Sequence, residues 1–539
     1  MNMEIQTNEN LIKKMEQAVT VEICEGSAKI ISENRVFYNP VQQFNRDLSL
    51  SVLSTFWKIC QNESEQRKSG KKVAGNDFSD GLRVLEALSA TGLRSIRYAK
   101  EVPGIKEIIA NDLSSAAVKS IKENIKLNNV EHLVTASEAN ATTLMYNSVD
   151  AKSRFDAIDL DPYGNPTMFL DGAVQSISEG GILLITATDM AILAGNNAES
   201  CYAKYGSVPL KTKACHEQAL RILLRCIESH ATRYGRYIKP LLSISADFYI
   251  RVFVRVFTSP LECKKSSSKQ SMFYECTGCS THTFQPLGIL KPNGTEKNPN
   301  QFKYALPVVP SVKENCEQCK SRYHMGGPIW TAPIHDQAFV DMLYNLIQTE
   351  PYKNLETNQR IYGMLSVIRE ELLDVPLYYT LEHVCCVLKL QCIPIVKLRS
   401  ALLHAGYKVS FSHANKTSIK TNAPSNVLWD ILRNWAKLNP VNAKHLEKNP
   451  IVKAMFSKEP ENTYNLNDIH PEANPSSRAK ALSRFPANPM PNWGPGTRST
   501  LMIGDEKLPK KIQNQNKNKQ KRQNAETTGE SQSKQAKTI

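Results

Sequence analysis

Residues 84–94 of the 539-residue chain read VLEALSATGLR, an apolar strand that ends in Glu86 and passes through a turn of small residues into a helix. The turn has a single glycine, Gly92, but its alanines and serine are small enough for close backbone approach. A strand, a tight turn and a helix in this order form the repeating unit of parallel α/β sheets. Taken alone, the turn could also be an ordinary strand-to-helix connection.

Short apolar runs and amphipathic stretches alternate from residue 82 to about residue 257. The apolar runs predict strands buried on both faces at residues 83–88, 108–111, 155–160 and 181–186. The amphipathic stretches predict helices between them, such as residues 114–127 and 166–177. This alternation predicts an α/β fold, a parallel sheet covered by helices on both faces. The stretch DFYIRVFVRVF at residues 247–257 predicts a further strand near the sheet edge.

Polar residues at the ends of these strands are candidates for binding a nucleoside cofactor. Asp112 ends the second strand and could accept both ribose hydroxyls or cap the next helix; the upstream turn favours the ribose role. Asn140 and Ala141 follow a strand predicted at residues 133–136, where an adenine edge would lie, although Asn140 could equally form an Asx turn. Glu86 and Gly92 complete the candidate cofactor-binding residues of the turn.

The sharpest motif is DLDPYG at residues 159–164, directly after the fourth predicted strand. An exocyclic amine of a base is a poor nucleophile, because its lone pair is delocalised into the ring. The Asp161 carboxylate and the Pro162 carbonyl could hold the amine N–H groups, while Tyr163 stacks on the base. Asp-Pro-Tyr-Gly is also good turn chemistry. Its place after a buried strand and a cofactor turn favours a catalytic role in methyl transfer to such an amine.

The cysteine pattern predicts a structural zinc site. Cys276 and Cys279 form one pair with two residues between them, and Cys316 and Cys319 form another. Two such pairs can complete a tetrahedral site of four thiolates, although the intervening loop is longer than the usual zinc-ribbon spacing. The chain shows no export signal, so its 13 cysteines are expected to be reduced thiols or metal ligands. His282 and His324 are alternative ligands, but surface histidines are the commoner case.

Charge and hydropathy narrow the classes of partner. The formal net charge of +15 suits a polyanion such as RNA, or equally a solubilising surface with a basic tail. The longest apolar candidate, residues 181–195, is interrupted by Asp189 and is too short for a membrane span. The N-terminus carries three glutamates and no arginine before Arg35, so neither a signal peptide nor a mitochondrial presequence is expected.

Five segments are predicted along the chain. They are a lead-in at residues 1–34, an α/β domain at 35–260, a zinc-binding insertion at 261–330, a C-terminal domain at 331–436 and an extended basic tail at 437–539. Residues 61–80 of the second segment are expected to form a polar loop. In the C-terminal domain, helices at 377–390 and 395–404 and a strand at 407–411 are compatible with a winged-helix-type module.

Basic residues towards the C-terminus predict contact with RNA. The Lys and Arg side chains of residues 399–420, with Tyr407 and Phe411, could contact RNA or could be an ordinary solvated face. Disorder is expected from about residue 505. The lysine clusters at 510–511 and 517–522 could act as a nuclear import signal or a nonspecific RNA-binding tail. The expected location is therefore the nucleus, with a cytoplasmic share left open.

Several motifs occur together in a fixed order. They are FYNP at residues 37–40, NRD at 45–47, LSATGLR at 88–94, DLDPYG at 159–164 and DFYIRV at 247–252. This ordered set resembles the tRNA (guanine-26-N2)-dimethyltransferase family over residues 36–493. The resemblance implies a Rossmann-like class I methyltransferase domain with an appended zinc-binding and α+β C-terminal domain. It also implies S-adenosylmethionine as methyl donor and tRNA as partner.

The resemblance carries further residue roles. It implies that Arg46 and Arg94 hold the methionine part of the cofactor, and that Phe37 lines the guanine pocket with Tyr163. Asp161 would accept the guanine amine. The function expected is therefore transfer of one and then two methyl groups to N2 of guanine 26 in tRNA. No membrane association and no obligate protein partner are expected.

Rival functions remain open at this point. One is methylation of another exocyclic amine, such as adenine N6 in DNA or ribosomal RNA. Another is a non-catalytic RNA-binding protein that retains a methyltransferase fold, against which the intact motif at residues 161–163 argues. A dehydrogenase is the least favoured function, because the turn lacks the glycines that a dinucleotide needs and the DPY motif at residues 161–163 would have no role.

Overall fold

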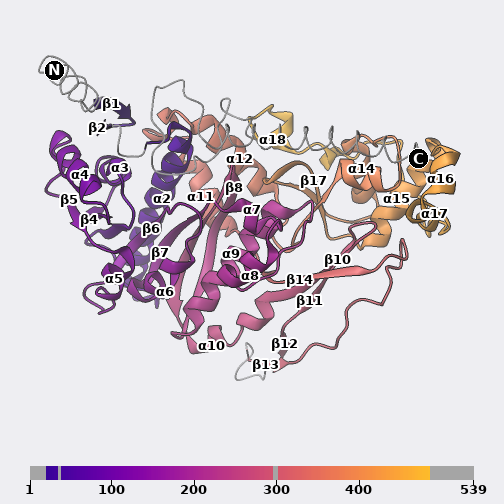
Figure 1. Cartoon of the computed structure of the whole chain (residues 1–539), viewed down its shortest axis with the longest axis horizontal. Helices are drawn as coiled ribbons and strands as arrows, with labels where there is room; N and C mark the ends of the chain where they lie inside the picture. The colour runs from indigo at the N-terminus through magenta and orange to yellow at the C-terminus, as the bar shows by residue number, and fades with distance from the viewer. Residues whose placement is uncertain (1–19, 34–37, 295–300, 486–539) are drawn as a thin grey trace, which may run out of the picture.

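The computed structural model describes residues 20–33, 38–294 and 301–485. Figure 1 shows an elongated molecule in which the first half of the chain surrounds a large sheet at one end. The helices α14 (Ile395–His404) to α17 (Pro450–Phe456) lie at the other end of the molecule, whereas α18 (Ser476–Ala479) returns to the middle beside α12 (Asn358–Glu370) (Figure 1). No helix among the described residues combines the length and apolar character that a membrane span needs.

Seven strands form the central sheet in the order β5-β4-β3-β6-β7-β9-β8. Their bounds, in chain order, are β3 (Leu82–Glu86), β4 (Ile105–Asp112), β5 (Val134–Glu138), β6 (Phe155–Leu160), β7 (Ile177–Ala187), β8 (Arg236–Ala246) and β9 (Tyr249–Thr258). The pairs among β5, β4, β3, β6 and β7 are parallel, and β9 runs antiparallel to both neighbours. The predicted parallel sheet is confirmed, and β6 has the bounds that the sequence predicted.

The strand predicted near the sheet edge lies one position further in. Every residue of β9 except Thr258 is buried, because β8 pairs along its outer side. The two strands join in a tight hairpin with Asp247 in the left-handed region, at φ 49°. The sequence did not indicate β8, which carries Pro240 beside an irregularity in its pairing with β9. Proline is tolerated there because β8 is the edge strand.

Helices cover both faces of the sheet. One face carries α2 (Gln43–Lys68), α3 (Leu93–Glu101), α4 (Ser115–Leu127), α11 (Gln337–Leu346) and α12 (Asn358–Glu370). The other carries α5 (Ala141–Tyr146), α6 (Thr167–Ser176), α7 (Met190–Leu193), α8 (Ala198–Tyr205) and α9 (Cys215–Thr232). Successive strand residues point to opposite faces, so Val84 belongs to the first core and Leu85 to the second. This arrangement explains why the strands read as continuous apolar runs.

Two helical regions differ from the predicted segments. The expected loop at residues 61–80 is helical as far as Lys68, because α2 continues beyond Cys60. Glu63 in this extension pairs with Arg255 of β9 at 2.6 Å, a contact that local sequence does not reveal. The helices α11 and α12 pack on α2 in the first core, although the sequence assigns them to the C-terminal domain. The boundary at residue 331 stays a prediction.

The middle of the chain forms small antiparallel sheets. The strands β10 (Gln270–Cys276), β11 (His282–Pro286) and β14 (Tyr323–Trp330) pair in the order β11-β10-β14. A separate pair is formed by β12 (Ile289–Pro292) and β13 (Phe302–Ala305). Another pair, β1 (Thr20–Glu25) with β2 (Ala28–Glu33), precedes the large domain. The short elements here are α10 (Pro260–Cys263), η1 (Pro40–Gln42), η2 (Ser266–Lys269) and η3 (Tyr352–Asn354).

The C-terminal domain mixes helices with a three-stranded sheet. In chain order its elements are β15 (Tyr379–Thr380), α13 (Leu381–Val387), α14 (Ile395–His404), β16 (Val409–Ser412), β17 (Asn415–Thr421) and α15 (Ser425–Leu438). The sheet order is β15-β17-β16. Two helices followed by a hairpin match the order of elements predicted for a winged-helix-type module. The domain shares one core with the cysteine-bearing insertion.

The segment predicted as an extended tail is partly folded. It contains α16 (Ala443–Lys448), α17 (Pro450–Phe456), η4 (Pro471–Ala473) and α18 (Ser476–Ala479). Val452 and Met455 of α17 are fully buried, so apolar packing holds this part against the C-terminal domain. The disorder predicted from about residue 505 lies outside the described residues.

Candidate active site

A cavity of about 550 Å³ opens at the carboxyl ends of β3, β4 and β6. Ligands of open α/β sheets bind at this edge, where helices leave the sheet towards opposite faces. The predicted site residues that line the cavity are Arg46, Glu86, Arg94, Asp112, Asp161, Pro162 and Tyr163. The predicted residues Gly92, Asn140 and Ala141 do not line it. Phe37 lies outside the described residues.

Gly92 shapes the turn through its backbone. It precedes α3 with φ 77°, and a β-carbon there would lie 3.3 Å from the Ile121 side chain. Ala90 of the same turn also has positive φ, at 49°, and its N–H donates to Asp112 Oδ2 at 2.9 Å. The turn and the end of β4 are therefore tied together at the cavity wall.

The carboxylate of Asp112 is held in a fixed orientation. Its Oδ1 accepts from the Ser114 N–H at 2.9 Å, and Ser114, not Asp112, caps α4. Each carboxylate oxygen has two acceptor sites, so one remains on each oxygen after these backbone bonds. Asp112 lines the cavity with this capacity left for two hydroxyl donors.

Asn140 forms a local turn and caps a helix, which was the alternative to an adenine contact. Its Oδ1 caps α5 by accepting from the N–H groups of Thr142 and Thr143, at 2.9 and 3.3 Å. Ala141 is buried in the core between α5 and the sheet. The adenine contact assigned to these two residues therefore stays a prediction without support from the cavity lining.

The loop that carries Asp161 is pinned to the end of β7. Gly164 N–H donates to Thr188 Oγ1, and Thr188 N–H donates back to the Gly164 carbonyl, both at 2.8 Å. Pro162 is buried, whereas Tyr163 is 56% exposed at the cavity rim. Partial desolvation on the side of Tyr163 that faces the cavity, together with the nearby Asp161 carboxylate, raises its pKa, so the hydroxyl stays protonated. The exposed ring is placed to meet an incoming planar group.

Arg94 is the charged centre of the cavity floor. It is buried and contacts Asp161 Oδ2, and its Nη1 lies 3.5 Å from Asp159 Oδ2. Although burial opposes charge, these carboxylates hold the pKa of Arg94 well above its usual value. Glu86 lies 3.5 Å from Arg94 and accepts from Ser95 Oγ at 2.5 Å. Burial nonetheless raises the pKa of Glu86 to about 7.

Arg46 lines the cavity but is already paired. Its Nε and Nη2 donate to the two oxygens of Glu25 at 2.7 and 2.5 Å, and its Nη2 also donates to the Asn39 carbonyl at 3.2 Å. The guanidinium also lies 5.3 Å from the centre of the Tyr38 ring. A bidentate pair of this kind satisfies much of the charge of Arg46 within the protein.

Among the residues that sequence reasoning did not assign to the site are Asn45, Phe248 and Thr188. Asn45 is fully buried between Arg94 and Asp161, Phe248 lines the cavity from the β8–β9 hairpin, and Thr188 pins the loop that carries Asp161. Asn45 and Phe248 belong to the NRD and DFYIRV motifs, so those motifs could have suggested them. Nothing in the local sequence distinguishes Thr188.

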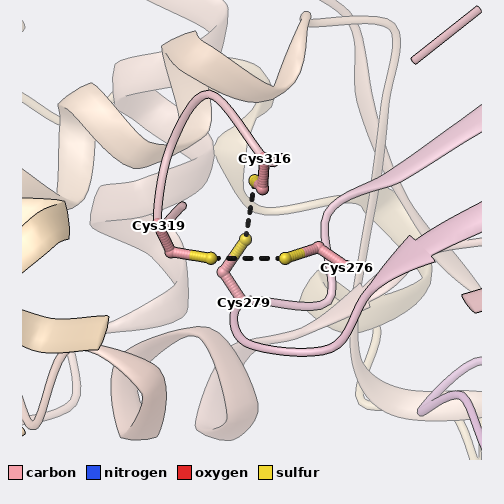
Figure 2. Close-up of side chains that lie close together, drawn as sticks. All are labelled: Cys276, Cys279, Cys316 and Cys319. Carbon is pink, nitrogen blue, oxygen red and sulfur yellow. Dashed lines mark hydrogen bonds between the residues drawn. The ribbon is translucent and has the colours of Figure 1, made fainter. Parts of the chain in front are cut away.

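The four predicted zinc ligands come together. Figure 2 shows Cys276, Cys279, Cys316 and Cys319 converging from two knuckles, and all four are buried. Their sulfurs lie within 4.8 Å of one another, with Cys276 and Cys319 at 3.2 Å and Cys279 and Cys316 at 3.6 Å. A tetrahedral Zn–S4 centre with bonds of about 2.3 Å places its sulfurs about 3.8 Å apart. The cluster fits such a centre, and His282 and His324 are not part of it.

A second cluster contains His335, Glu371 and His413; His413 bonds Glu371, whereas Nε2 of His335 is buried without a hydrogen-bond partner in the described part of the chain. The rings accept from the N–H groups of Ser243 and Ser245, at 3.3 and 3.2 Å, which uses one nitrogen of each ring. His413 Nδ1 bonds Glu371 Oε2 at 2.9 Å, and Lys420 lies on the other oxygen at 2.7 Å. A lysine cation beside the carboxylate opposes metal binding, so the cluster joins the two domains instead.

The RNA contacts predicted for residues 399–420 are wrong for three side chains only; Lys408 and Lys416 are exposed and Tyr407 is half-buried, so their contacts stay a prediction. Lys420 is buried, and Arg399 donates to the Ala473 carbonyl at 2.8 Å beneath the surface. Phe411 is buried under Arg399, which lies 4.6 Å from the ring centre. These three side chains pack inside the domain, where RNA cannot reach them, because tertiary packing covers a stretch that looked solvated in sequence.

The strand order, the single antiparallel strand β9 and a cavity at the carboxyl ends define a class I methyltransferase. The family model for N2,N2-dimethylguanosine tRNA methyltransferase matches residues 13–433, which is most of the chain. The chain therefore belongs to the N2,N2-dimethylguanosine tRNA methyltransferase family.

Individual relatives agree with this family. The tRNA (guanine(26)-N(2))-dimethyltransferase of Drosophila melanogaster is 56% identical over 95% of this chain and 90% of the relative. The enzyme of the same name from Homo sapiens is 46% identical over 88% of this chain and 77% of the relative. The structure of Trm1 from Pyrococcus horikoshii with S-adenosyl-L-methionine matches with a TM-score of 0.59 at 29% identity. That match covers 76% of this chain and 98% of the archaeal chain.

Proposed function

We propose that this protein transfers one and then two methyl groups from S-adenosylmethionine to N2 of guanine 26 in tRNA. The observation that carries this proposal is the cavity in which Asp161, Pro162 and Tyr163 face the cofactor turn and Asp112. Family membership supplies the substrate class. The bound cofactor supplies an electrophilic methyl group on a sulfonium, whose departure leaves a neutral thioether.

The residues present fit this cofactor. Asp112 retains one acceptor site on each oxygen for the two ribose hydroxyls. Arg94 lines the cavity as a cation for the cofactor carboxylate, and the Gly92 turn allows close backbone approach. Arg46 is a weaker candidate for the carboxylate, because Glu25 already engages it on two atoms.

The chemistry at guanine follows from the acceptors at the Asp161 loop. Asp161 Oδ1 makes no hydrogen bond within the described part of the chain, so it can accept one amine N–H. The Pro162 carbonyl would take the second N–H, and the Tyr163 ring would stack on the base. Holding both hydrogens favours a nitrogen with a localised lone pair, aimed at the methyl group. Asp161 Oδ1 then receives the proton that the methylated nitrogen loses.

The guanine must leave its stack to reach this cavity. Its N2 edge is occupied in a paired base, and the acceptors lie below the rim on which Tyr163 sits. In enzymes that modify bases, the free energy lost when the base leaves its stack is offset by stacking and hydrogen bonds in the pocket. The partly exposed Tyr163 ring suits that role.

We also propose that the four clustered cysteines bind a structural zinc ion. Two knuckles with equivalent backbone bonds support it: Ser280 N–H donates to the Cys276 carbonyl and Lys320 N–H to the Cys316 carbonyl, both at 2.9 Å. Both donors have positive φ, which repeats the same turn in each knuckle. The ion would join the insertion to the C-terminal domain, with which the cysteines share a core.

The basic C-terminal tail is proposed as a nuclear import signal, which would place the protein in the nucleus with a share in the cytoplasm. Its lysine clusters at residues 510–511 and 517–522 support this, and they lie outside the described residues. A fluorescent protein fused to residues 505–539 should enter the nucleus, and replacing the lysines should abolish entry. A fusion that stays cytoplasmic would contradict the import role.

The proposed reaction is tested by incubating the protein with labelled S-adenosylmethionine and unmodified tRNA, and identifying the methylated nucleoside. Wild type should give N2-methylguanosine and N2,N2-dimethylguanosine at position 26. Asp161→Ala should lose about 100-fold or more of the rate, because the amine acceptor is gone. Asp150→Ala, which removes an exposed carboxylate outside the cavity, is the matched control.

Other outcomes of this experiment decide between the rivals. N6-methyladenosine without N2-methylguanosine would show that another exocyclic amine is the target. Binding of cofactor and tRNA with no methylated product would show a non-catalytic RNA-binding protein. Full activity of Asp161→Ala would remove Asp161 from the mechanism while leaving the family function intact.

A further inference from the structure

Arg94, Asp161 and Asn45 form a closed triangle at the cavity floor. Arg94 Nη2 contacts Asp161 Oδ2, and Arg94 Nη1 donates to Asn45 Oδ1 at 3.0 Å. Asn45 closes the triangle by donating from Nδ2 to the same Asp161 oxygen at 3.4 Å. The Asn45 amide is fully buried, and Ser49 Oγ, which donates to the Asn45 backbone carbonyl at 2.6 Å, accepts from Arg94 Nη1 at 3.3 Å. The amide is therefore fixed in an orientation that serves both charged groups.

Two requirements of the proposed reaction conflict in this arrangement. Arg94 must offer its cation to the cofactor carboxylate, yet in this structure it is paired with Asp161. Asp161 must accept from the guanine amine, yet the Arg94 guanidinium occupies part of the hydrogen-bonding capacity of its carboxylate. Asp159 is a weaker partner for Arg94 than Asp161, since Arg251 already bonds both Asp159 oxygens at 2.9 and 2.8 Å.

We propose that Arg94 exchanges Asp161 for the carboxylate of the cofactor, and that Asn45 is a positioning residue that retains Asp161 after the exchange. This inference rests on the proposed function. Asn45 Nδ2 remains on Asp161 Oδ2 and leaves Oδ1 directed to the guanine amine. The acceptor is thereby released only when the methyl donor is bound, which places cofactor binding before productive binding of guanine.

The exchange makes Asp161 a competitor of the cofactor carboxylate. Exchanging Asp and Asn changes the number of carboxylates beside Arg94 while the size of the side chain stays the same. Asp161→Asn removes one competitor, and Asn45→Asp adds one on the opposite side of the same guanidinium. The two variants should therefore shift cofactor affinity in opposite directions.

The measurement is calorimetric binding at pH 8 of two unreactive probes to the full-length protein. S-adenosylhomocysteine carries the carboxylate, whereas 5′-methylthioadenosine keeps the nucleoside and lacks the amino-acid part. For S-adenosylhomocysteine, Asp161→Asn should tighten binding by about three- to tenfold and Asn45→Asp should weaken it by a similar factor. Binding of 5′-methylthioadenosine should change by less than about twofold in either variant, because it makes no contact with Arg94.

Three results would overturn the exchange. One is S-adenosylhomocysteine binding that is unchanged in Asp161→Asn, and another is equal tightening of both probes. The third is weaker binding in Asp161→Asn, which would mean that Asp161 holds the cofactor ammonium group. Failure of wild type to bind either probe would instead contradict the proposed function. If Asn45→Asp does not fold, as judged by thermal unfolding, Asp161→Asn alone decides.

The role of Asn45 is tested separately by Asn45→Ala with tRNA as variable substrate. Loss of the amide leaves Asp161 without its remaining donor, so kcat should fall by about tenfold while the KM for tRNA stays within about twofold. Asn45→Ser retains a short polar group and should recover part of kcat. An unchanged kcat in Asn45→Ala would remove the positioning role.

Discussion

Arg251 on β9 bonds both carboxylate oxygens of Asp159 on β6, at 2.9 and 2.8 Å, across the intervening strand β7. Both side chains are fully buried, and Thr186 of β7 accepts a further bond from Arg251. Burial alone would raise the pKa of Asp159, but Arg251 and Arg94 outweigh it and hold the pKa below its usual value. This pair lies directly beneath the loop that carries Asp161 and keeps the floor of the cavity rigid.

Replacing Arg251 with methionine should destabilise the protein by about 3–5 kcal/mol, because Asp159 would be left buried without its main partner. The loss should appear as a lower urea midpoint with an unchanged slope. Arg322→Met, at a highly exposed arginine, is the control and should change stability by less than about 0.5 kcal/mol. A lowered folded-state pKa contributes stability above the unfolded value of 3.8 that is lost as pH falls, so the deficit should shrink in acid. An equal effect of both variants would contradict this role.

Glu86 should make the protein less stable as pH rises. Its folded-state pKa of about 7 exceeds the ordinary value of 4.5, so its contribution is fully present below 4.5 and is lost as pH rises through 7. The difference corresponds to on the order of 3 kcal/mol. Unfolding free energies measured from pH 5 to pH 8 should fall in wild type, and Glu86→Gln should flatten the slope. A slope that is the same in both proteins would assign the pH dependence to other groups.

If the proposed zinc ion is bound, its removal should unfold the insertion and loosen the C-terminal domain. Trp429 of α15 donates to Thr281 Oγ1 beside the cysteine cluster at 2.8 Å, so loss of the metal should alter its fluorescence. Cys279→Ser should lose bound zinc in elemental analysis and lower Tm by several degrees. Cys386→Ser, at an exposed cysteine outside the cluster, should keep one zinc per chain. Wild type without zinc, and insensitive to chelators, would contradict the site.

Lys420 should couple the two domains through buried charge. Its Nζ lies 3.1 Å from Glu217 Oε1 on α9 and 2.7 Å from Glu371 Oε1, and all three side chains are buried. Lys420→Met leaves two carboxylates facing each other and should cost about 3–5 kcal/mol in urea unfolding. Lys408→Met, at an exposed lysine of the same domain, should have little effect. Hydrogen exchange that is unchanged along α9 in Lys420→Met would show that the domains are held by other contacts.

The strands and the cysteine pairs were predictable because their signals are local. A strand buried on both faces must be apolar throughout, so β3, β4, β6 and β7 could be read directly from composition. A tetrahedral thiolate site requires closely spaced cysteines, and the two pairs supplied them. The position of DPY after β6 was likewise predictable, because it depends only on where the strand ends.

The partners of the polar side chains were decided by tertiary structure. Arg46 was expected to hold the methionine part of the cofactor, but β1 brings Glu25 to it. Asn140 is used as a helix cap, and buried Lys420 bonds Glu217, which lies 203 residues earlier in the chain. The pairing of Arg94 with Asp161 joins residues 67 positions apart. Such contacts depend on how elements pack, and no local pattern encodes them.

By itself, the sequence determined the class of fold, the order of the apolar strands, the four cysteines that cluster and the candidate residues for cofactor and base. Only the tertiary structure decided which of those residues face the cavity, which are neutralised by partners, and that Asn45 lies between Arg94 and Asp161. The physical reason is the distance along the chain over which each signal extends. Hydrophobic periodicity is visible within a few residues, whereas ion pairs in a buried site depend on how distant elements pack.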